Sequence, residues 1–172
     1  MHCTGSTATF RHLFRAVGAN VDRYRSYPRV VGETGGKGFV LAHASADLEA
    51  PTVLQVADPK SWPMTEELFA PVTAAYVYDD AEWDATLPLV DDSTPYGLTG
   101  AVFGTDDRAI VEADQALRYT AGNLTINDKP TGAVVGQQPF GGARASGTND
   151  KIGTVWSSIR FLSPRSVKRR EG

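Results

Sequence analysis

A long glycine-rich loop, Asn127 to Lys151, holds residues whose types suggest a ligand site. Its many glycines and prolines exclude a helix or a central strand, yet it also contains Val134, Val135 and Phe140. A flexible linker would not carry such apolar side chains. A loop of this kind inside a folded chain is usually a binding or active-site loop, although an ordinary surface loop fits the composition equally well.

A second glycine-rich stretch, Gly32 to Gly38, contains the carboxylate of Glu33. A carboxylate on a glycine turn suits a mobile general base, because the backbone can pivot there and admit a substrate. A solvated glutamate in a turn explains the same spacing. The stretch is not a phosphate-binding P-loop, since valine stands at position 31 and glycine at position 38.

The composition limits the class of protein. With 172 residues, 41% of them hydrophobic, the chain can bury a core as one domain or as pieces of a larger protein. A net charge of −3 with interspersed signs gives no electrostatic case for nucleic acid or an anionic membrane, and the basic run 165–170 suits a solvated tail. Cys3 is the single cysteine, so no internal disulfide forms. No apolar run reaches the ~20 residues of a membrane helix, and the N-terminus lacks signal-peptide features. We expect a cytoplasmic protein without a metal site.

The apolar spacing predicts three helices, over residues 7–17, from residue 80 to about 90, and from residue 105 to a stop at 122. Ser6 or Thr7 can cap the first helix. Pro88 lies inside the second, where it should cost ~3 kcal/mol or force a kink.

Short apolar runs predict the strands, over residues 29–31, 39–42, 52–56, 72–78, 98–103, 124–126 and 155–162. Strands that alternate with helices argue for an α/β protein with a largely parallel sheet.

Four motifs in one order resemble the aldehyde dehydrogenase superfamily, and most closely its pyrroline-5-carboxylate (glutamate-semialdehyde) dehydrogenase branch. They are the turn Thr4 to Ser6, the stretch Gly32 to Lys37, the run Glu66 to Val72, and the loop segment Gly132 to Gly142. Each motif alone is a weak or moderate signal, whereas the ordered set is a strong one. The loop segment Gly132 to Gly142 is the motif that indicates the pyrroline-5-carboxylate dehydrogenase branch.

The resemblance implies a partial aldehyde dehydrogenase fold, with most of the parallel sheet of the catalytic domain. Residues 1–28 resemble a remnant of the NAD-binding domain, residues 29–154 an incomplete catalytic domain, and residues 155–172 a C-terminal oligomerisation strand and tail. Between Ala50 and Pro51 the family has a long segment that this chain lacks. We therefore expect an internally deleted C-terminal fragment.

The resemblance also implies roles in binding NAD and activating water. Glu33 resembles the general base that activates the hydrolytic water. Gly5 and Ser6 resemble contacts to the phosphates of NAD. Glu67 resembles the residue that holds the nicotinamide ribose, and Phe69 its neighbour along the nicotinamide.

The glycine-rich loop, Asn127 to Lys151, resembles the site that holds the aldehyde. Gly132 and Ala133 resemble a pair of backbone N–H groups that anchor the substrate carboxylate, and such charge-assisted hydrogen bonds are strong. Phe140 resembles the wall against the aliphatic part of the substrate.

The nucleophile of this family is missing from the chain. The chemistry needs a thiolate downstream of the Glu33 motif to attack the aldehyde before hydride passes to NAD. No cysteine follows Glu33, and Cys3 matches no catalytic position. Two hypotheses remain. The chain descends from an NAD-dependent dehydrogenase that oxidises L-glutamate γ-semialdehyde to L-glutamate in proline degradation, and no longer turns over. Alternatively it is a non-enzymatic remnant: either the product of a decayed gene, or a fragment that associates with intact subunits, or with further copies of itself, through its C-terminal strand.

Overall fold

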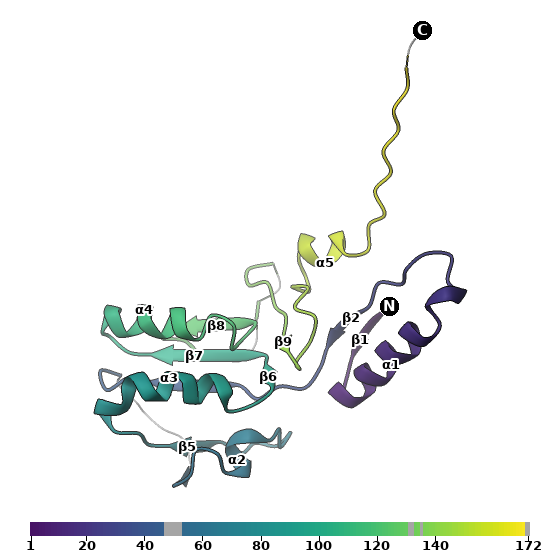
Figure 1. Cartoon of the computed structure of the whole chain (residues 1–172). Coiled ribbons are helices and arrows are strands. Elements are labelled where there is room, and N and C mark those ends of the chain that lie inside the picture. Colours follow the sequence, from purple (N-terminus) through teal and green to yellow (C-terminus); the bar gives the residue numbers. More distant parts are fainter. Residues whose placement is uncertain (47–52, 131–132, 135, 171–172) are drawn as a thin grey trace.

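The computed structural model describes residues 1–46, 53–130, 133–134 and 136–170 (Figure 1). Most strands pair in parallel: β1 (His2–Thr4) with β2 (Val31–Glu33), β4 (Leu54–Val56) with β5 (Ala74–Tyr76), and β7 (Thr99–Phe103) with both β3 (Phe39–Ala42) and β8 (Asn123–Ile126). The short strands β6 (Tyr96–Gly97) and β9 (Ala143–Arg144) pair antiparallel. The α/β class and the predominance of parallel pairing are therefore confirmed.

The helices are α1 (Thr7–Ala19), α2 (Trp62–Thr65), α3 (Trp83–Asp92), α4 (Asp107–Ala116) and α5 (Val155–Ile159), with two 3₁₀ turns, η1 (Val21–Arg23) and η2 (Asp80–Glu82). Ser6 caps α1 by accepting the N–H of Thr9, and the carboxylate of Asp106 caps α4 by accepting two N–H groups. In the part of the chain that the structure describes, no helix is long and apolar enough to cross a membrane.

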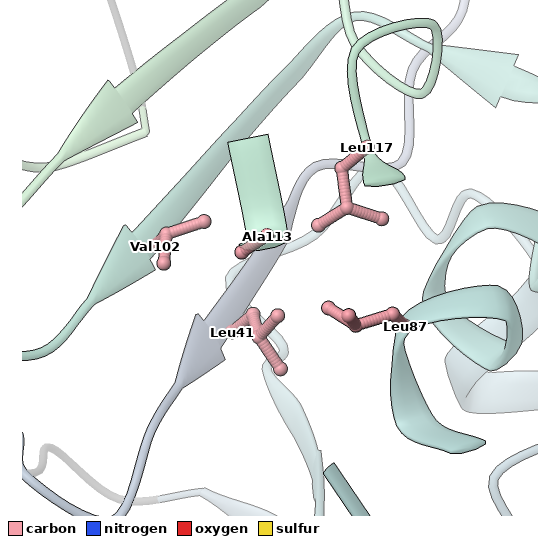
Figure 2. Close-up of a cluster of buried hydrophobic side chains, with 5 residues drawn as sticks. All are labelled: Leu41, Leu87, Val102, Ala113 and Leu117. Atoms are coloured by element: carbon pink, nitrogen blue, oxygen red, sulfur yellow. The ribbon is translucent and has the colours of Figure 1, made fainter. Parts of the chain in front are cut away.

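The core lies between the three-stranded sheet and two helices. Figure 2 shows Leu41 of β3 and Val102 of β7 facing Leu87 of α3 and Ala113 of α4, with Leu117 closing the cluster. Leu41 and Val102 are register neighbours in the parallel pair, so their side chains share one face of the sheet. Both helices, α3 and α4, therefore pack against the same face of the β3–β7–β8 sheet and fix its position.

The helix around Pro88 forms in spite of the proline. Pro88 lies inside α3, where it cannot donate to the carbonyl of Asp84. The exposed position of its ring and the burial of the neighbouring Thr86 and Leu87 explain why the helix persists. The predicted stop of α4 at Gly122 is wrong by several residues, because the wholly buried Leu117 already ends the helix.

The strand predicted over residues 155–162 is also wrong, because this segment begins with the short helix α5. A short apolar run cannot be assigned to strand or helix by periodicity alone. Here the hydrogen bonds are local, since the carbonyl of Thr154 accepts from the hydroxyl of Ser157 and from the N–H of Ser158. Trp156, which an added strand would have covered, is 65% exposed.

The chain has an open shape, with α1 and the β1–β2 pair projecting from the sheet that contains β7 (Figure 1). Its accessible surface is 11968 Å². A compact protein of this mass exposes roughly 8,000 Å². The apolar stripe predicted for α1 is in part solvent-exposed, and Phe14 is 54% accessible.

Candidate active site around Glu33

Glu33 is the last residue of β2, and every residue of this strand is buried. The sequence allows either a mobile carboxylate or a solvated glutamate on a turn, and the structure shows neither: Glu33 is in a strand and is only 7% exposed. The reason is tertiary. Glu33 forms an isolated antiparallel bridge with Gly147, and its carbonyl accepts the N–H of Gly5 across 3.1 Å. These contacts hold the backbone of Glu33 from both sides.

The two carboxylate oxygens of Glu33 have different surroundings. Oε2 accepts the backbone N–H of Gly142 at 2.9 Å. Oε1 is buried and finds no hydrogen-bond partner among residues 1–46, 53–130, 133–134 and 136–170. A buried acceptor without a partner carries an energetic cost and calls for an explanation, and a free carboxylate oxygen is able to accept a proton.

Burial raises the pKa of Glu33 above its ordinary value of 4.5. The N–H of Gly142 and the ammonium group of Lys151 oppose this increase, whereas the carboxylate of Asp150 adds to it. Burial likewise lowers the pKa of Lys151, and the charge of Glu33 opposes that change. A glutamate whose pKa moves toward neutrality is a better general base, because it then holds a proton more strongly.

Residues 145–148 join the loop to β2. Thr148 donates its N–H to the carbonyl of Gly32 at 2.9 Å and accepts the N–H of Gly32 on its hydroxyl at 3.1 Å. Thr34 donates its N–H to Ser146 and its hydroxyl to Ala145. These hydrogen bonds hold the turn that follows Glu33 against the loop, so the backbone of this turn is not free to rotate.

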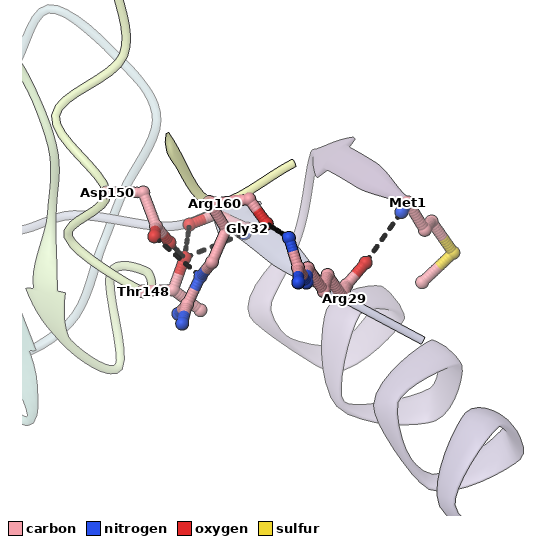
Figure 3. Close-up of polar contacts among 6 residues, drawn as sticks. All are labelled: Met1, Arg29, Gly32, Thr148, Asp150 and Arg160. Atoms are coloured by element: carbon pink, nitrogen blue, oxygen red, sulfur yellow. Dashed lines mark hydrogen bonds and ion pairs between the residues drawn. The ribbon is translucent and has the colours of Figure 1, made fainter. Parts of the chain in front are cut away.

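Ion pairing fixes the far end of the same loop. Asp150 bonds to the hydroxyl of Thr148 and pairs with Nε of Arg160 at 2.8 Å (Figure 3). Arg29 in turn donates to the carbonyls of Arg160 and Leu162. The C-terminal segment is therefore connected to the chain immediately before β2.

Close packing explains two glycines of the site. A Cβ on Gly32 would lie 2.4 Å from the ring of Phe10, and a Cβ on Gly142 would lie 2.7 Å from Ser146. Neither distance is compatible with a larger side chain unless the neighbour moves. These glycines are present because backbone segments and a helix meet around Glu33.

The proposed phosphate contacts lie beside Glu33, but their donors are already engaged. The N–H of Gly5 bonds to Glu33, and the hydroxyl of Ser6 accepts from Thr9 as the helix cap. The N–H groups of Thr7 and Ala8 have no hydrogen-bond acceptor within the described ranges. The N-terminus of α1 therefore still fits an anionic phosphate through these two donors.

The other two predicted NAD contacts occupy different surroundings. The carboxylate of Glu67 accepts the N–H of Gly36 at 3.0 Å, and Gly36 lies three residues after Glu33 along the chain. Phe69 is 96% exposed and has a φ of 45°, a conformation unusual for a side chain of its size. Glu67 is thus close to the site, whereas the side chain of Phe69 projects into solvent.

The predicted substrate loop is joined to Glu33 through Gly142. Phe140 lies two residues before this donor, is half-buried, and bridges to Ile152. Ala133 is half-buried near the turn in which Gln137 and Gln138 donate to the carbonyl of Val134. Gly132, the other predicted anchor, lies outside the described residues, as does the predicted deletion point between residues 50 and 51.

Comparison with known proteins identifies the family. A model of the aldehyde dehydrogenase family matches residues 49–167. The chain belongs to this family. One curated relative of this chain is the mitochondrial delta-1-pyrroline-5-carboxylate dehydrogenase of Bos taurus, which is 34% identical over 268 residues. The alignment covers 98% of this chain and 48% of the relative. The chain spans about half the length of the curated relatives that it matches.

Solved structures of the same family agree with the fold. The delta-pyrroline-5-carboxylate dehydrogenase of Mycobacterium tuberculosis is 32% identical, with a TM-score of 0.83, and the match covers 96% of this chain and 48% of that one. The same bacterial enzyme bound with NAD matches with a TM-score of 0.78. The comparisons thus support NAD as the cofactor of these relatives.

The sequence alone does not indicate several residues that surround Glu33. Gly142, Thr148, Asp150 and Lys151 belong to the glycine-rich loop, but nothing in their spacing indicates that they surround Glu33. The adjacent pair Gly141–Gly142 is the one usable signal, since paired glycines favour a close approach of backbone to another group.

Proposed function

We propose that this chain descends from an NAD-dependent L-glutamate γ-semialdehyde dehydrogenase of proline degradation, keeps the general-base region, and does not turn over. One observation supports this proposal most directly. Glu33 is buried, its Oε1 has no hydrogen-bond partner among the described residues, its Oε2 accepts the N–H of Gly142, and no cysteine follows it in the sequence.

The residues that remain can perform part of the reaction. Oε1 of Glu33 would accept a proton from a water molecule, and the raised pKa suits that role. The N–H groups near Ala133 would bind the substrate carboxylate, and Phe140 would pack against its methylene groups. NAD, held at the N-terminus of α1 and beside Glu67, would supply the hydride acceptor.

The missing step is covalent attack on the aldehyde. In this family a thiolate forms the adduct from which hydride leaves, and a carboxylate base does not replace it. Cys3 lies in β1, on the strand that pairs with β2, and its place before the cofactor turn matches no nucleophile of the family. We therefore expect binding without oxidation.

The test is an assay of the purified chain with NAD and L-glutamate γ-semialdehyde. We expect no increase in NADH absorbance, while calorimetry with NAD alone measures whether the cofactor binds. A substrate-dependent increase that disappears in Glu33→Gln would contradict the proposal, because it would demonstrate turnover through this site.

A second candidate function is association with other subunits, as a remnant without catalysis. It is favoured by the large accessible surface and by exposed apolar side chains in the C-terminal segment, Val155, Trp156 and Leu162 among them. Sedimentation and co-purification with a full-length dehydrogenase test it. A monomer at all concentrations that does not co-purify would count against it.

The domain division at residues 28/29 and 154/155 and the cytoplasmic location stay predictions. The bovine relative is a mitochondrial protein. Limited proteolysis would test the boundaries, and fractionation of cells that produce the tagged chain would test the location.

A further inference from the structure

Arg144 adopts a backbone conformation that an arginine does not favour. The N–H of Ser146 donates to the carbonyl of Ala143 at 2.9 Å, so residues 143–146 form a tight turn with Arg144 as its second residue. The φ of Arg144 is 51°, which lies in the left-handed region. Turns with this conformation at the second position are usually built with glycine, asparagine or aspartate. An arginine persists there only where the surrounding structure holds it.

The side chain of Arg144 makes the contact that holds it. Its Nη1 donates to the carbonyl of Asp91 and its Nη2 donates to Oδ1 of the same residue, each at 2.6 Å. The two side chains are 29% and 33% exposed, so water and salt screen this ion pair less than a pair on the open surface. A guanidinium group presents its donors as a rigid fork, which allows one side chain to bind both acceptors at once.

Asp91 is itself fixed to the rest of the fold. It lies in the last turn of α3, the helix that contributes Leu87 to the core. Its Oδ1 also accepts the hydroxyl of Thr120, a residue that is only 4% exposed. The acceptor that Arg144 binds is therefore held by a packed helix and by a buried hydroxyl group.

The turn that contains Arg144 lies directly beside Glu33. Gly142 precedes the turn and donates its N–H to Oε2 of Glu33 at 2.9 Å. Within the turn, the carbonyl of Ala145 accepts the hydroxyl of Thr34, the residue that follows β2. A change of backbone conformation within the turn would therefore move the N–H donor of Gly142 relative to the carboxylate.

We propose that Arg144 is a positioning residue for Glu33. By binding Asp91, its guanidinium group keeps the turn in the left-handed conformation, and the turn in that conformation directs the N–H of Gly142 to Oε2 of Glu33. The inference rests on the proposed function, because it treats Glu33 as the general base of that site. Nothing in the sequence indicates this role, since Arg144 and Asp91 are separated by 53 positions.

Nuclear magnetic resonance of the full chain tests the proposal through two signals. The first is the exchange rate of the Gly142 amide, which reports its hydrogen bond to Glu33. In Arg144→Ala we expect this amide to exchange about tenfold faster or more, relative to the amide of Val102 in the core. The reference to Val102 removes any contribution from unfolding of the whole chain.

The second signal is the titration midpoint of the side-chain carboxyl carbon of Glu33, assigned with Glu33→Gln. Burial raises the pKa of Glu33, and the N–H of Gly142 opposes this increase. In Arg144→Ala the opposing hydrogen bond is weakened, so we expect the midpoint to move to higher pH. An ion pair that merely stabilised the fold would not move this midpoint.

Arg144→Gly separates the backbone conformation from the ion pair. It removes the guanidinium group as alanine does, but glycine adopts a φ of 51° without strain. We therefore expect the glycine variant to keep most of the Gly142 protection that the alanine variant loses. Equal loss of protection in the two variants would contradict the proposal, since the left-handed conformation would then not be what Arg144 maintains.

Arg108→Ala is the matched control. It removes the ion pair between Arg108 and Glu112 on α4, where the arginine side chain is 85% exposed, and it should change neither signal. Should Arg144→Ala fail to fold, Asp91→Asn removes the charge of the partner and keeps its shape. We expect it to move both signals in the same directions by a smaller amount.

Two further results would overturn the inference. One is an unchanged Gly142 amide and an unchanged Glu33 midpoint in Arg144→Ala. The other is an acceleration at Gly142 no greater than that at Val102, which would report a loss of stability in the whole chain. Neither signal depends on turnover, so an NADH assay tests the proposed function separately. Production of NADH would contradict that function and leave the role of Arg144 standing.

Discussion

The backbone N–H of Gly142 donates to Oε2 of Glu33 at 2.9 Å, while the other carboxylate oxygen is buried without a partner in the described structure. One hydrogen bond does not compensate for the removal of a carboxylate from water. The pKa of Glu33 is raised for that reason, and the site favours a protonated or a substrate-bound glutamate.

Stability should therefore decrease as the pH increases past the ordinary pKa of Glu33. The raised pKa means that the folded chain binds this proton more tightly than the unfolded chain does. This proton therefore contributes to the free energy of unfolding. The contribution is fully present below pH 4.5 and is lost as the pH rises through the pKa of Glu33 in the folded chain. Urea denaturation at a series of pH values measures the slope. We expect Glu33→Gln to remove this component, whereas Glu66→Gln, at an exposed position, leaves the slope as it is.

Replacement of Gly142 should destabilise the loop. In Gly142→Ala the new Cβ lies 2.7 Å from Ser146, so the loop must shift and the hydrogen bond to Glu33 lengthens. We expect a loss of about 1–3 kcal/mol in the free energy of unfolding. Gly18→Ala is the control, since its Cβ meets no atom within 4 Å and alanine favours the helix by about 0.5–1 kcal/mol. Equal stability of the two variants would contradict the packing described for the loop.

The contact between Asp150 and Arg160 should hold the C-terminal segment on the loop. In Asp150→Asn the ion pair is replaced by a neutral contact, and we expect about 1–2 kcal/mol of lost stability. Protease cleavage near α5 should become faster. The substitution also removes a negative charge that raises the pKa of Glu33, so that pKa should decrease. Asp92→Asn, at an exposed position, should change neither property.

Removal of Pro88 should stabilise α3. Pro88→Ala restores an N–H that can bond to the carbonyl of Asp84, and the side chain is exposed, so no packing is lost. We expect a gain of about 1–3 kcal/mol. Pro88→Gly should fall about 1 kcal/mol below the alanine variant, because it restores the N–H without the helix propensity. Thermal unfolding of the three proteins establishes the order.

The elements that the sequence predicts well are those with strong local signals. The stripe of α1 and the apolar runs of β3 and β7 are determined by residues next to one another. Residues 155–162 contain no comparable signal, because a strand there would need a partner edge that the pattern does not specify. Assigning these residues to a strand requires a neighbouring strand with which they could pair, and the sequence does not show one.

The site was predicted in part, for a related physical reason. Motif resemblance identified Glu33, Glu67 and the loop, but the burial of Glu33 depends on contacts with residues more than a hundred positions away. Neither spacing nor propensity reports such contacts. The pKa of Glu33, and the roles of Lys151 and Asp150 in it, required the three-dimensional arrangement.

The pairing of Gly32 with Thr148 has a consequence for the order of folding. These residues are separated by 116 positions, so their contact closes a loop that includes most of the chain. During synthesis β2 leaves the ribosome long before Thr148 is made. Until then Glu33 is an ordinary hydrated carboxylate, and a ribosome that stalls before the loop releases a chain without a formed site. The environment that distinguishes Glu33 from other glutamates is among the last parts of the molecule to assemble.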